Sequence, residues 1–151
     1  MDRTDRITME REKAGEDGNA PVVAAEDLHK SFGDQKVLNG ISLKVSRSET
    51  LAVLGRSGSG KSVLLRLIIG LQKPDSGSVR IHGQDIAGLA LDQLGEIRMK
   101  MGFLFQYGAL YDSLTVEQNV AFPLQHHKKE MSRSEQGGRV RELLAEVGME
   151  G

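Results

Sequence analysis

Short apolar stretches bounded by turn residues occupy the first third of the chain. Val22–Leu28 and Ile41–Val45 have the composition of strands, and Phe32-Gly33-Asp34 and Asn39-Gly40 are turn signals between them. Thr50–Leu54 follows as a run bounded like a buried strand. The pattern therefore predicts strands at all three stretches.

The next positions change to a helical pattern. Ser62–Ile69 is almost wholly apolar, with Arg66 as its charged residue, and such a helix packs against a sheet. Gly70 is suited to end this helix. The segment Lys73-Pro74-Asp75-Ser76-Gly77 then predicts a turn, and Ser78–Ile81 predicts another strand.

The second half of the chain is predicted to be mainly helical. Leu89–Lys100 has apolar residues at helical spacing, and Met101–Phe105 is apolar enough for a short strand. An irregular segment follows at residues 106–114. We expect Thr115 to begin a short helix that ends near Pro123.

The final predicted element is an amphipathic helix. Ser132 and Ser134 are both candidates for its first residue, because either hydroxyl can accept a hydrogen bond from the first helical turn. Gly148 is the residue expected to close it.

Composition narrows the class of protein. A chain of 151 residues with 38% hydrophobic content predicts one domain with a real core. The formal net charge of −1 gives no basic field for nucleic acid, and the absence of cysteine excludes disulfides and thiolate metal sites. The N-terminus lacks the apolar core of a signal peptide, and no apolar run reaches the roughly 20 residues of a membrane span. We therefore expect a soluble, cytoplasmic domain.

One motif is specific enough to indicate a particular chemistry. It fits the P-loop pattern G-x-x-x-x-G-K-[ST] at every fixed position and consists of Gly55, Arg56, Ser57, Gly58, Ser59, Gly60, Lys61 and Ser62. A flexible serine and glycine turn that happens to precede a lysine is the plainer alternative. The motif requires a strand before the loop and a helix after it, and both are predicted here, which favours phosphate binding.

Each residue type in the motif has a separate role. Glycines let the backbone curl so that successive N–H groups face phosphate oxygens. The helix that follows adds unpaired N–H groups and the positive end of its dipole. Lys61 can reach the β- and γ-phosphates of a nucleotide, and the Ser62 hydroxyl can ligate Mg²⁺.

Further residues give the chain a resemblance to a known family. Strands that look antiparallel before the P-loop, the turn Pro74-Asp75-Ser76-Gly77 after its helix, and Phe103-Leu104-Phe105-Gln106 together resemble the ATP-binding subunit of an ABC transporter. The resemblance covers the chain from about Val22 to its end. It implies an α/β P-loop NTPase (ABC ATPase) fold, here its N-terminal portion, with an antiparallel β subdomain and the start of a helical subdomain.

The same resemblance implies roles for two residues outside the P-loop. Phe32 matches the aromatic of the A-loop, which stacks on adenine, and Gln106 matches the Q-loop glutamine, which approaches Mg²⁺ and the γ-phosphate. ATP and Mg²⁺ are thus the implied cofactors. Phe32 as a turn aromatic and Gln106 as an ordinary strand-end residue are the alternatives. The position of Gln106 directly after a predicted buried strand favours the ligand role.

The segment Phe103–Leu124 resembles a narrower group, the MCE-type and phospholipid-asymmetry systems that move lipids between bacterial membranes. This implies a transmembrane permease as partner, a second ATP-binding subunit in the full-length parent, and a lipid handled through the permease. It also implies a position on the inner face of the cell membrane. The apolar residues around Tyr107, Leu110, Tyr111 and Leu114 suit either docking of a partner helix or local packing.

The chain departs from the family in its last third. It contains no signature loop, no Walker B strand with its adjacent glutamate, and no switch histidine. Without a carboxylate to position water, phosphates can be held but the γ-bond is not attacked efficiently. Residues 21–151 are therefore expected to be the truncated, N-terminal part of an ABC ATP-binding domain, with the nucleotide-binding core extending to about residue 106 and the Q-loop and the start of the helical subdomain at residues 106–151. Residues 1–20 hold ten charged residues and almost no apolar spacing, so we expect a disordered tail there.

Whether the chain is itself an enzyme stays open on these grounds. Besides the transport subunit, we consider a non-hydrolysing nucleotide-binding or interaction module, and an ABC ATPase without a membrane partner. The tyrosine-containing segment after Gln106 argues against the last of these by resemblance.

Overall fold

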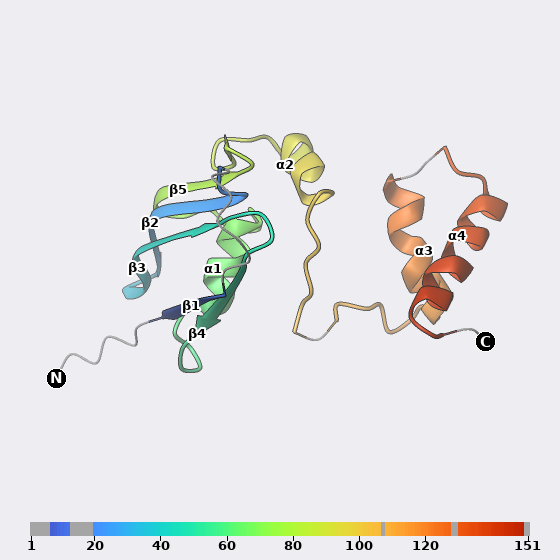
Figure 1. Cartoon of the computed structure of the whole chain (residues 1–151), viewed down its shortest axis with the longest axis horizontal. Coiled ribbons are helices and arrows are strands. Elements are labelled where there is room, and N and C mark those ends of the chain that lie inside the picture. Colours follow the sequence, from blue (N-terminus) through green and yellow to red (C-terminus); the bar gives the residue numbers. More distant parts are fainter. Residues whose placement is uncertain (1–6, 13–19, 107, 128–129, 150–151) are drawn as a thin grey trace. The chain divides into compact units, whose positions relative to one another are not determined.

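The computed structural model describes residues 7–12, 20–106, 108–127 and 130–149 (Figure 1). The chain divides into two compact units, Met1–Gly102 and Phe103–Gly151, and each is described by itself. No helix within the described ranges is long and apolar enough to cross a bilayer.

A four-stranded antiparallel sheet is the main β structure of the first unit. Its strand order is β3-β2-β5-β6, with β2 at Val23–Phe32, β3 at Gln35–Val45, β5 at Ser76–Ile81 and β6 at Gln84–Asp85. The turn at Gly33 and Asp34 joins β2 to β3, as predicted, and Gly33 has the positive φ of 57° that such a turn needs. The strands are longer than predicted because β2 continues through His29–Phe32, which lie after the apolar run.

Irregular pairing bends this sheet. Asn39 and Gly40 lie inside β3, whereas the sequence predicted a turn between strands there. Gly40 adopts a φ of 75°, and the register between β3 and β2 shifts at this point, as in a β-bulge. Gly77 has a φ of 91°, and a Cβ at this position would collide with the backbone of Glu26 and Asp27. The close approach of β5 to β2 therefore requires glycine.

A second, two-stranded sheet belongs to the same unit. The strand β4, at Thr50–Leu54, was predicted, and it pairs antiparallel with β1 at Thr8–Glu12. The expectation of a disordered tail over residues 1–20 is therefore wrong for Thr8–Glu12. The tail has few apolar residues, and a composition of this kind predicts disorder. Two of those residues, Ile7 and Met9, nevertheless pack against the core and compensate for their polar neighbours. Residues 1–6 and 13–19 lie outside the described part of the chain.

Two helices complete the first unit, α1 at Lys61–Ile68 and α2 at Leu91–Arg98, both close to prediction. The core of this unit is made of aliphatic side chains that are at most 6% exposed. Its members are Ala25, Leu28, Leu38, Leu43, Leu64, Leu67, Val79, Ile81, Ile86 and Leu94. Since α1 contributes Leu64 and Leu67, the helix predicted to pack on a sheet does so.

Arg98 of α2 connects the two helices. Its Nε donates to the carbonyl oxygen of Ile69 at 2.9 Å, and its Nη2 donates to that of Gly70 at 2.7 Å. These carbonyls follow the C-terminal end of α1, where helix carbonyls lack intrahelical partners and a positive charge is favourable. Gly70 has a φ of 69° and ends the helix as predicted.

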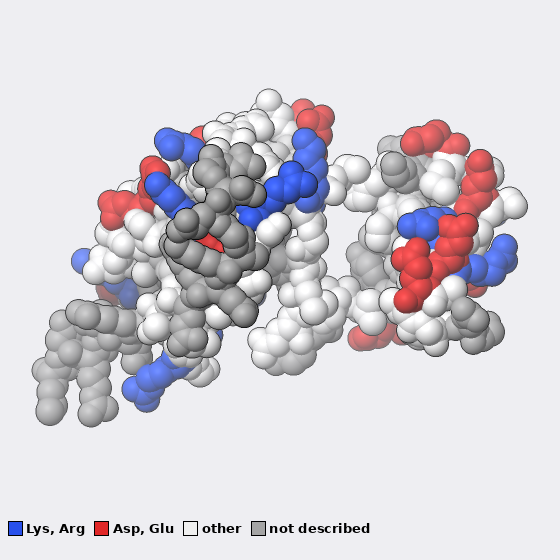
Figure 2. Space-filling model, in the orientation of Figure 1, with Lys and Arg blue, Asp and Glu red and all other residues white. Residues whose placement is uncertain are grey.

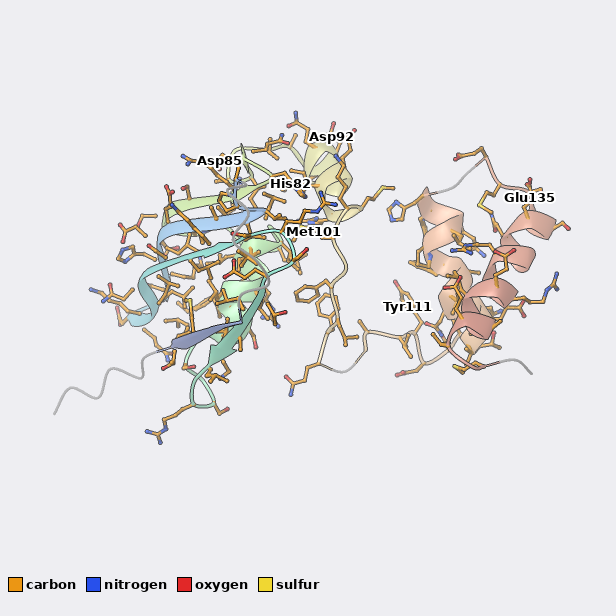
Figure 3. All side chains as sticks on the ribbon, viewed as in Figure 1. His82, Asp85, Asp92, Met101, Tyr111 and Glu135 are labelled. Atoms are coloured by element: carbon orange, nitrogen blue, oxygen red, sulfur yellow. The ribbon has the colours of Figure 1, made fainter. Side chains whose placement is uncertain are left out.

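The second unit contains two helices, α3 at Val116–His127 and α4 at Arg133–Glu146, which pack against each other. Ser132 is the N-cap of α4, since its hydroxyl accepts from the Glu135 N–H and the Glu135 carboxylate accepts from the Ser132 N–H. Figure 3 labels Glu135 on this first turn. Ser134, the alternative start, lies inside the helix.

Two predictions fail in this half of the chain. The helix α3 does not end near Pro123 but continues through it to His127, at the cost of one backbone hydrogen bond that proline cannot donate. Met101–Phe105 forms no strand, because no described strand offers it a backbone partner. Leu104 is consequently 88% exposed, while the rings of Phe103 and Phe105 contact each other edge to face at 4.6 Å.

Candidate phosphate-binding site

The P-loop residues form a turn between β4 and α1, as the motif requires. The strand ends at Leu54, and α1 begins at Lys61. The first helical bond is donated by the Leu64 N–H to the Gly60 carbonyl at 2.9 Å, and no side chain caps the helix start. The amides of the first turn of α1 are thus without helical acceptors, an arrangement that suits an anion.

Two glycines give the loop its curvature. Gly58 has a φ of 83° and Gly60 a φ of 95°, both in the left-handed region that side chains disfavour. A Cβ on Gly60 would also lie 2.9 Å from side-chain atoms of both Val37 and Leu38. Glycine is therefore required at position 60 for conformation and for space, whereas at position 58 only conformation requires it.

Lys61 folds back over the loop. Its Nζ donates to the Gly55 carbonyl at 2.7 Å and to the Arg56 carbonyl at 2.8 Å, and it lies 3.5 Å from the Ser59 hydroxyl. The ammonium group is therefore held at the centre of the curled backbone. An ammonium group has three N–H donors, so it can also donate to phosphate oxygens.

The serines of the loop differ in exposure. Ser59 is buried at 6% exposed, and its N–H donates to the Arg56 carbonyl at 3.2 Å, which closes the turn. Ser57 and Ser62 are exposed, and Ser62 lies on the first turn of α1 directly after Lys61. The described residues include no cluster of three or more His, Cys, Asp or Glu that could hold a metal by itself. A cation here would therefore need oxygens from a bound phosphate in addition to Ser62.

Phe32 lies at the end of β2, at the tip of the β2–β3 hairpin, and is 47% exposed. Near this tip, Lys30 pairs with Leu38, whose side chain limits the space at Gly60. The structure thus brings the start of β3 against the phosphate loop. The exposed ring leaves a face for stacking, and the Nζ of Lys30 lies 5.7 Å from its centroid.

Gln106 belongs to the second unit and is exposed. The structure therefore brings Gly55–Ser62 together within one loop and places Phe32 in the same unit, but it does not determine the position of Gln106 relative to them. Tyr107 lies outside the described residues. Leu110 and Tyr111 are 70% and 50% exposed, and the Tyr111 ring contacts that of Phe122 on α3.

The sequence did not reveal one polar contact beside Phe32. The Asp75 carboxylate accepts from the Lys30 Nζ at 2.7 Å and from the Ser31 N–H at 2.6 Å, and the Asp75 N–H donates to the His29 carbonyl at 2.9 Å. The hydrogen bonds from Lys30 and then Ser31 hold the pKa of Asp75 below its ordinary value. The hydrogen bonds of Asp75 thereby hold the end of β2 that carries Phe32 against the turn before β5.

The distribution of charge on the face drawn in Figure 2 can be compared with what a nucleic-acid site needs. On the face drawn in Figure 2, basic and acidic side chains are interspersed in both units, among those residues that the structure describes. On α4, for example, Arg139 pairs with Glu142 at 2.9 Å and lies 3.6 Å from Glu146. Binding to nucleic acid would need a concentrated basic surface.

A strand, a curled glycine loop and a helix with free N-terminal amides define a P-loop nucleotide-binding domain. The comparison with known families agrees, since the ABC transporter family matches residues 38–151. The chain belongs to the ABC transporter family, whose ATPases bind ATP with Mg²⁺.

The relatives and solved structures support this assignment. The methionine import ATP-binding protein MetN of Brucella abortus is 41% identical over 147 residues, covering 97% of this chain and 38% of that protein. The chloroplast protein trigalactosyldiacylglycerol 3 of Arabidopsis thaliana is 39% identical over 144 residues, covering 95% and 41%. This chain thus spans less than half the length of these relatives.

Among solved structures, the ATP-binding cassette MJ0796 in a dimeric post-hydrolysis state, bound to ADP and phosphate, has a TM-score of 0.65 at 31% identity. The match covers 82% of this chain and 56% of that one. The cbiO1 subunit of Clostridium perfringens, part of the transporter complex cbiONQ, has a TM-score of 0.67 at 26% identity over 87% of this chain and 52% of its own. The predicted ABC ATPase fold is confirmed.

Proposed function

We propose that this chain binds the phosphates of Mg-ATP at Gly55–Ser62 and serves as the nucleotide-binding part of an ABC transporter ATP-binding subunit. The observation that carries the proposal is the position of the Lys61 ammonium inside the curled loop, next to the free amides of α1. A positive charge and N–H donors without helical acceptors thus belong to the same loop and helix start, and both favour a phosphate group.

Residues outside the loop complete the proposed site. Phe32 stacks on the adenine, and its exposure at the hairpin tip beside the loop supports this role. Ser62 supplies one oxygen to Mg²⁺. Gln106 approaches Mg²⁺ and the γ-phosphate; this role follows from the family resemblance alone.

The proposed partners are a transmembrane permease and a second ATP-binding subunit, which would place the chain at the inner face of the cell membrane. The cassette MJ0796 is dimeric and cbiO1 belongs to a transporter complex, and both facts favour this assembly. The lipid substrate expected from Phe103–Leu124 is not supported, because the Brucella relatives are named for methionine import. We therefore propose a transport role without naming its substrate class.

Binding without efficient hydrolysis is the proposed behaviour of this chain alone. The loop can hold phosphates and neutralise their charge, but attack on the γ-phosphate also needs a group that orients water. Steady-state phosphate release measures this directly. If the intact chain releases phosphate and Lys61→Ala abolishes this release, the chain hydrolyses ATP. That result would exclude the alternative that the chain is a non-hydrolysing interaction module.

Titration of the chain with a fluorescent ATP analogue tests the site. Lys61→Ala removes the ammonium group at the loop centre and should weaken binding by at least about tenfold, or about 1.4 kcal/mol. Lys44→Ala, at an exposed position of β3, is the matched control and should leave affinity unchanged. Thermal unfolding of both variants separates lost binding from lost folding.

The result that would overturn the proposal is equal affinity in the intact chain and in Lys61→Ala. Gly60→Val provides a second test, since its side chain would meet Val37 and Leu38 and distort the loop. If both variants fold and still bind the analogue as the intact chain does, the nucleotide does not occupy this loop.

A further inference from the structure

The N-terminal strand β1 contacts the strand that leads into the phosphate loop. All five residues of β1 pair with β4, from Glu12 opposite Thr50 to Thr8 opposite Leu54. Leu54 is followed directly by Gly55, whose carbonyl accepts from Lys61. The ladder therefore extends to the residue directly before the loop.

Among the described strands, β4 has no other hydrogen-bonded neighbour than β1. The backbone of β4 is otherwise positioned by its own packing, because Leu51 and Val53 are partly buried against the core. Without β1, the N–H and C=O groups on the paired edge of β4 would have no partner among the described strands.

Side chains of the N-terminal segment also hold β1 in place. Ile7 and Met9 are partly buried and pack against the core of the first unit, while Thr8 between them is exposed. This alternation is that of a strand with one buried face. The pairing of β1 with β4 is thus supported by both backbone bonds and apolar contact.

We propose that β1 is a positioning strand for the phosphate loop: by pairing with the full length of β4, it sets the place at which Gly55 begins the curl around the phosphates. The proposal rests on the proposed nucleotide binding. Its physical basis is that preformed donors bind an anion more tightly than donors that must first be ordered.

Two deletions test the proposal in the otherwise full chain. Removal of residues 1–12 deletes β1, and removal of residues 1–6 leaves it as the matched control. Titration with a fluorescent ATP analogue should show affinity weakened about tenfold by the longer deletion and unchanged by the shorter one. Hydrogen exchange should show faster exchange at Leu51–Leu54 in the longer deletion, with β2 and β5 still protected.

A pair of substitutions keeps the test valid if the longer deletion does not fold. Met9→Glu places a charge on the packed side of β1, and Thr8→Glu places the same charge on its exposed side. Only Met9→Glu should weaken ATP binding and speed exchange at Leu51–Leu54. A general loss of stability would instead speed exchange in β2 and β5 as well.

The proposal is overturned if the longer deletion, or Met9→Glu in its place, retains both the affinity and the slow exchange of the intact chain. Failure of the intact chain to bind the analogue would count against the proposed function. Exchange at Leu51–Leu54 then still decides the role of β1, because that measurement needs no nucleotide. Slow exchange without β1 overturns the positioning role, and fast exchange supports it.

Discussion

At the scale of single residues, the sequence predicted what depends on local geometry. Gly58 and Gly60 were predicted because the motif places glycine where the backbone must curl, and both adopt positive φ. Asp75 was predicted only as a turn residue. Its contacts with Lys30 and Ser31 lie 45 and 44 positions away, so no local pattern could indicate them.

Asp75 makes stability depend on pH. Because its pKa in the folded chain lies below the ordinary value of 3.8, the folded state binds fewer protons than the unfolded state around that value. The contribution of Asp75 is therefore present above about pH 4 and is lost as the pH falls through the lowered pKa. Asp75→Asn should unfold at a lower temperature at pH 7 and show a weaker decline of stability in acid.

Thermal unfolding of Asp75→Asn between pH 2.5 and 7, at about half-unit steps, measures this effect. Asp34→Asn, in the exposed turn between β2 and β3, is the comparison variant and should follow the intact chain. An acid decline as steep in Asp75→Asn as in the intact chain would show that the hydrogen bonds of Asp75 do not contribute.

At the scale of elements, the helices were easier to predict than the strands. The helix α1 was predicted because its apolar residues are contiguous, and α4 because Ser132 and Glu135 form a local capping box. In contrast, β1 and the extended segment at Met101–Phe105 depend on whether a distant strand is available for pairing. The strand β1 pairs with β4, whereas Met101–Phe105 has no partner among the described strands. The pattern of apolar residues along the sequence cannot distinguish these two cases.

Arg98 provides a prediction at this scale, since it joins α2 to the end of α1. Arg98→Ala removes two hydrogen bonds from a guanidinium group to the Ile69 and Gly70 carbonyls, and it should lower the free energy of unfolding by about 1–3 kcal/mol. Arg98→Lys should recover only part of this, because an ammonium group lacks the fork that reaches both oxygens. Urea denaturation measures both variants.

Arg66→Ala is the control for Arg98, because it removes an exposed arginine from the last turn of α1 itself. A charge effect without specific hydrogen bonds should cost less than about 1 kcal/mol. Equal losses in Arg66→Ala and Arg98→Ala would show that the charge at the helix end matters and the fork does not.

At the scale of the whole molecule, the chain is organised as two units, whereas the composition predicted one domain. The boundary between the units falls at Gly102, and the end of the nucleotide-binding core at about residue 106 stays a prediction. The phosphate loop, the hairpin tip with Phe32 and both sheets belong to the first unit. The helices α3 and α4 contact each other in the second unit, and Val140 of α4 is buried there.

This division predicts a local response to nucleotide. With ATP and a chelator present, hydrogen exchange should slow in β4 and the first turn of α1, since phosphate oxygens accept from amides there. Exchange in α3 and α4 should stay unchanged in the absence of Mg²⁺. Equal slowing in both units would contradict the assignment of the phosphate loop and its contacts to the first unit.

The two ends of the helix α1 have different surroundings. Its first turn opens onto the phosphate loop, and the Ile69 and Gly70 carbonyls just beyond its last turn are bound by Arg98. An axial shift of α1, such as a γ-phosphate could cause by drawing its amides closer, must therefore either carry α2 along or break both bonds. Loss of the terminal phosphate would reverse the shift. The position of α2 would then depend on whether the bound nucleotide carries a γ-phosphate.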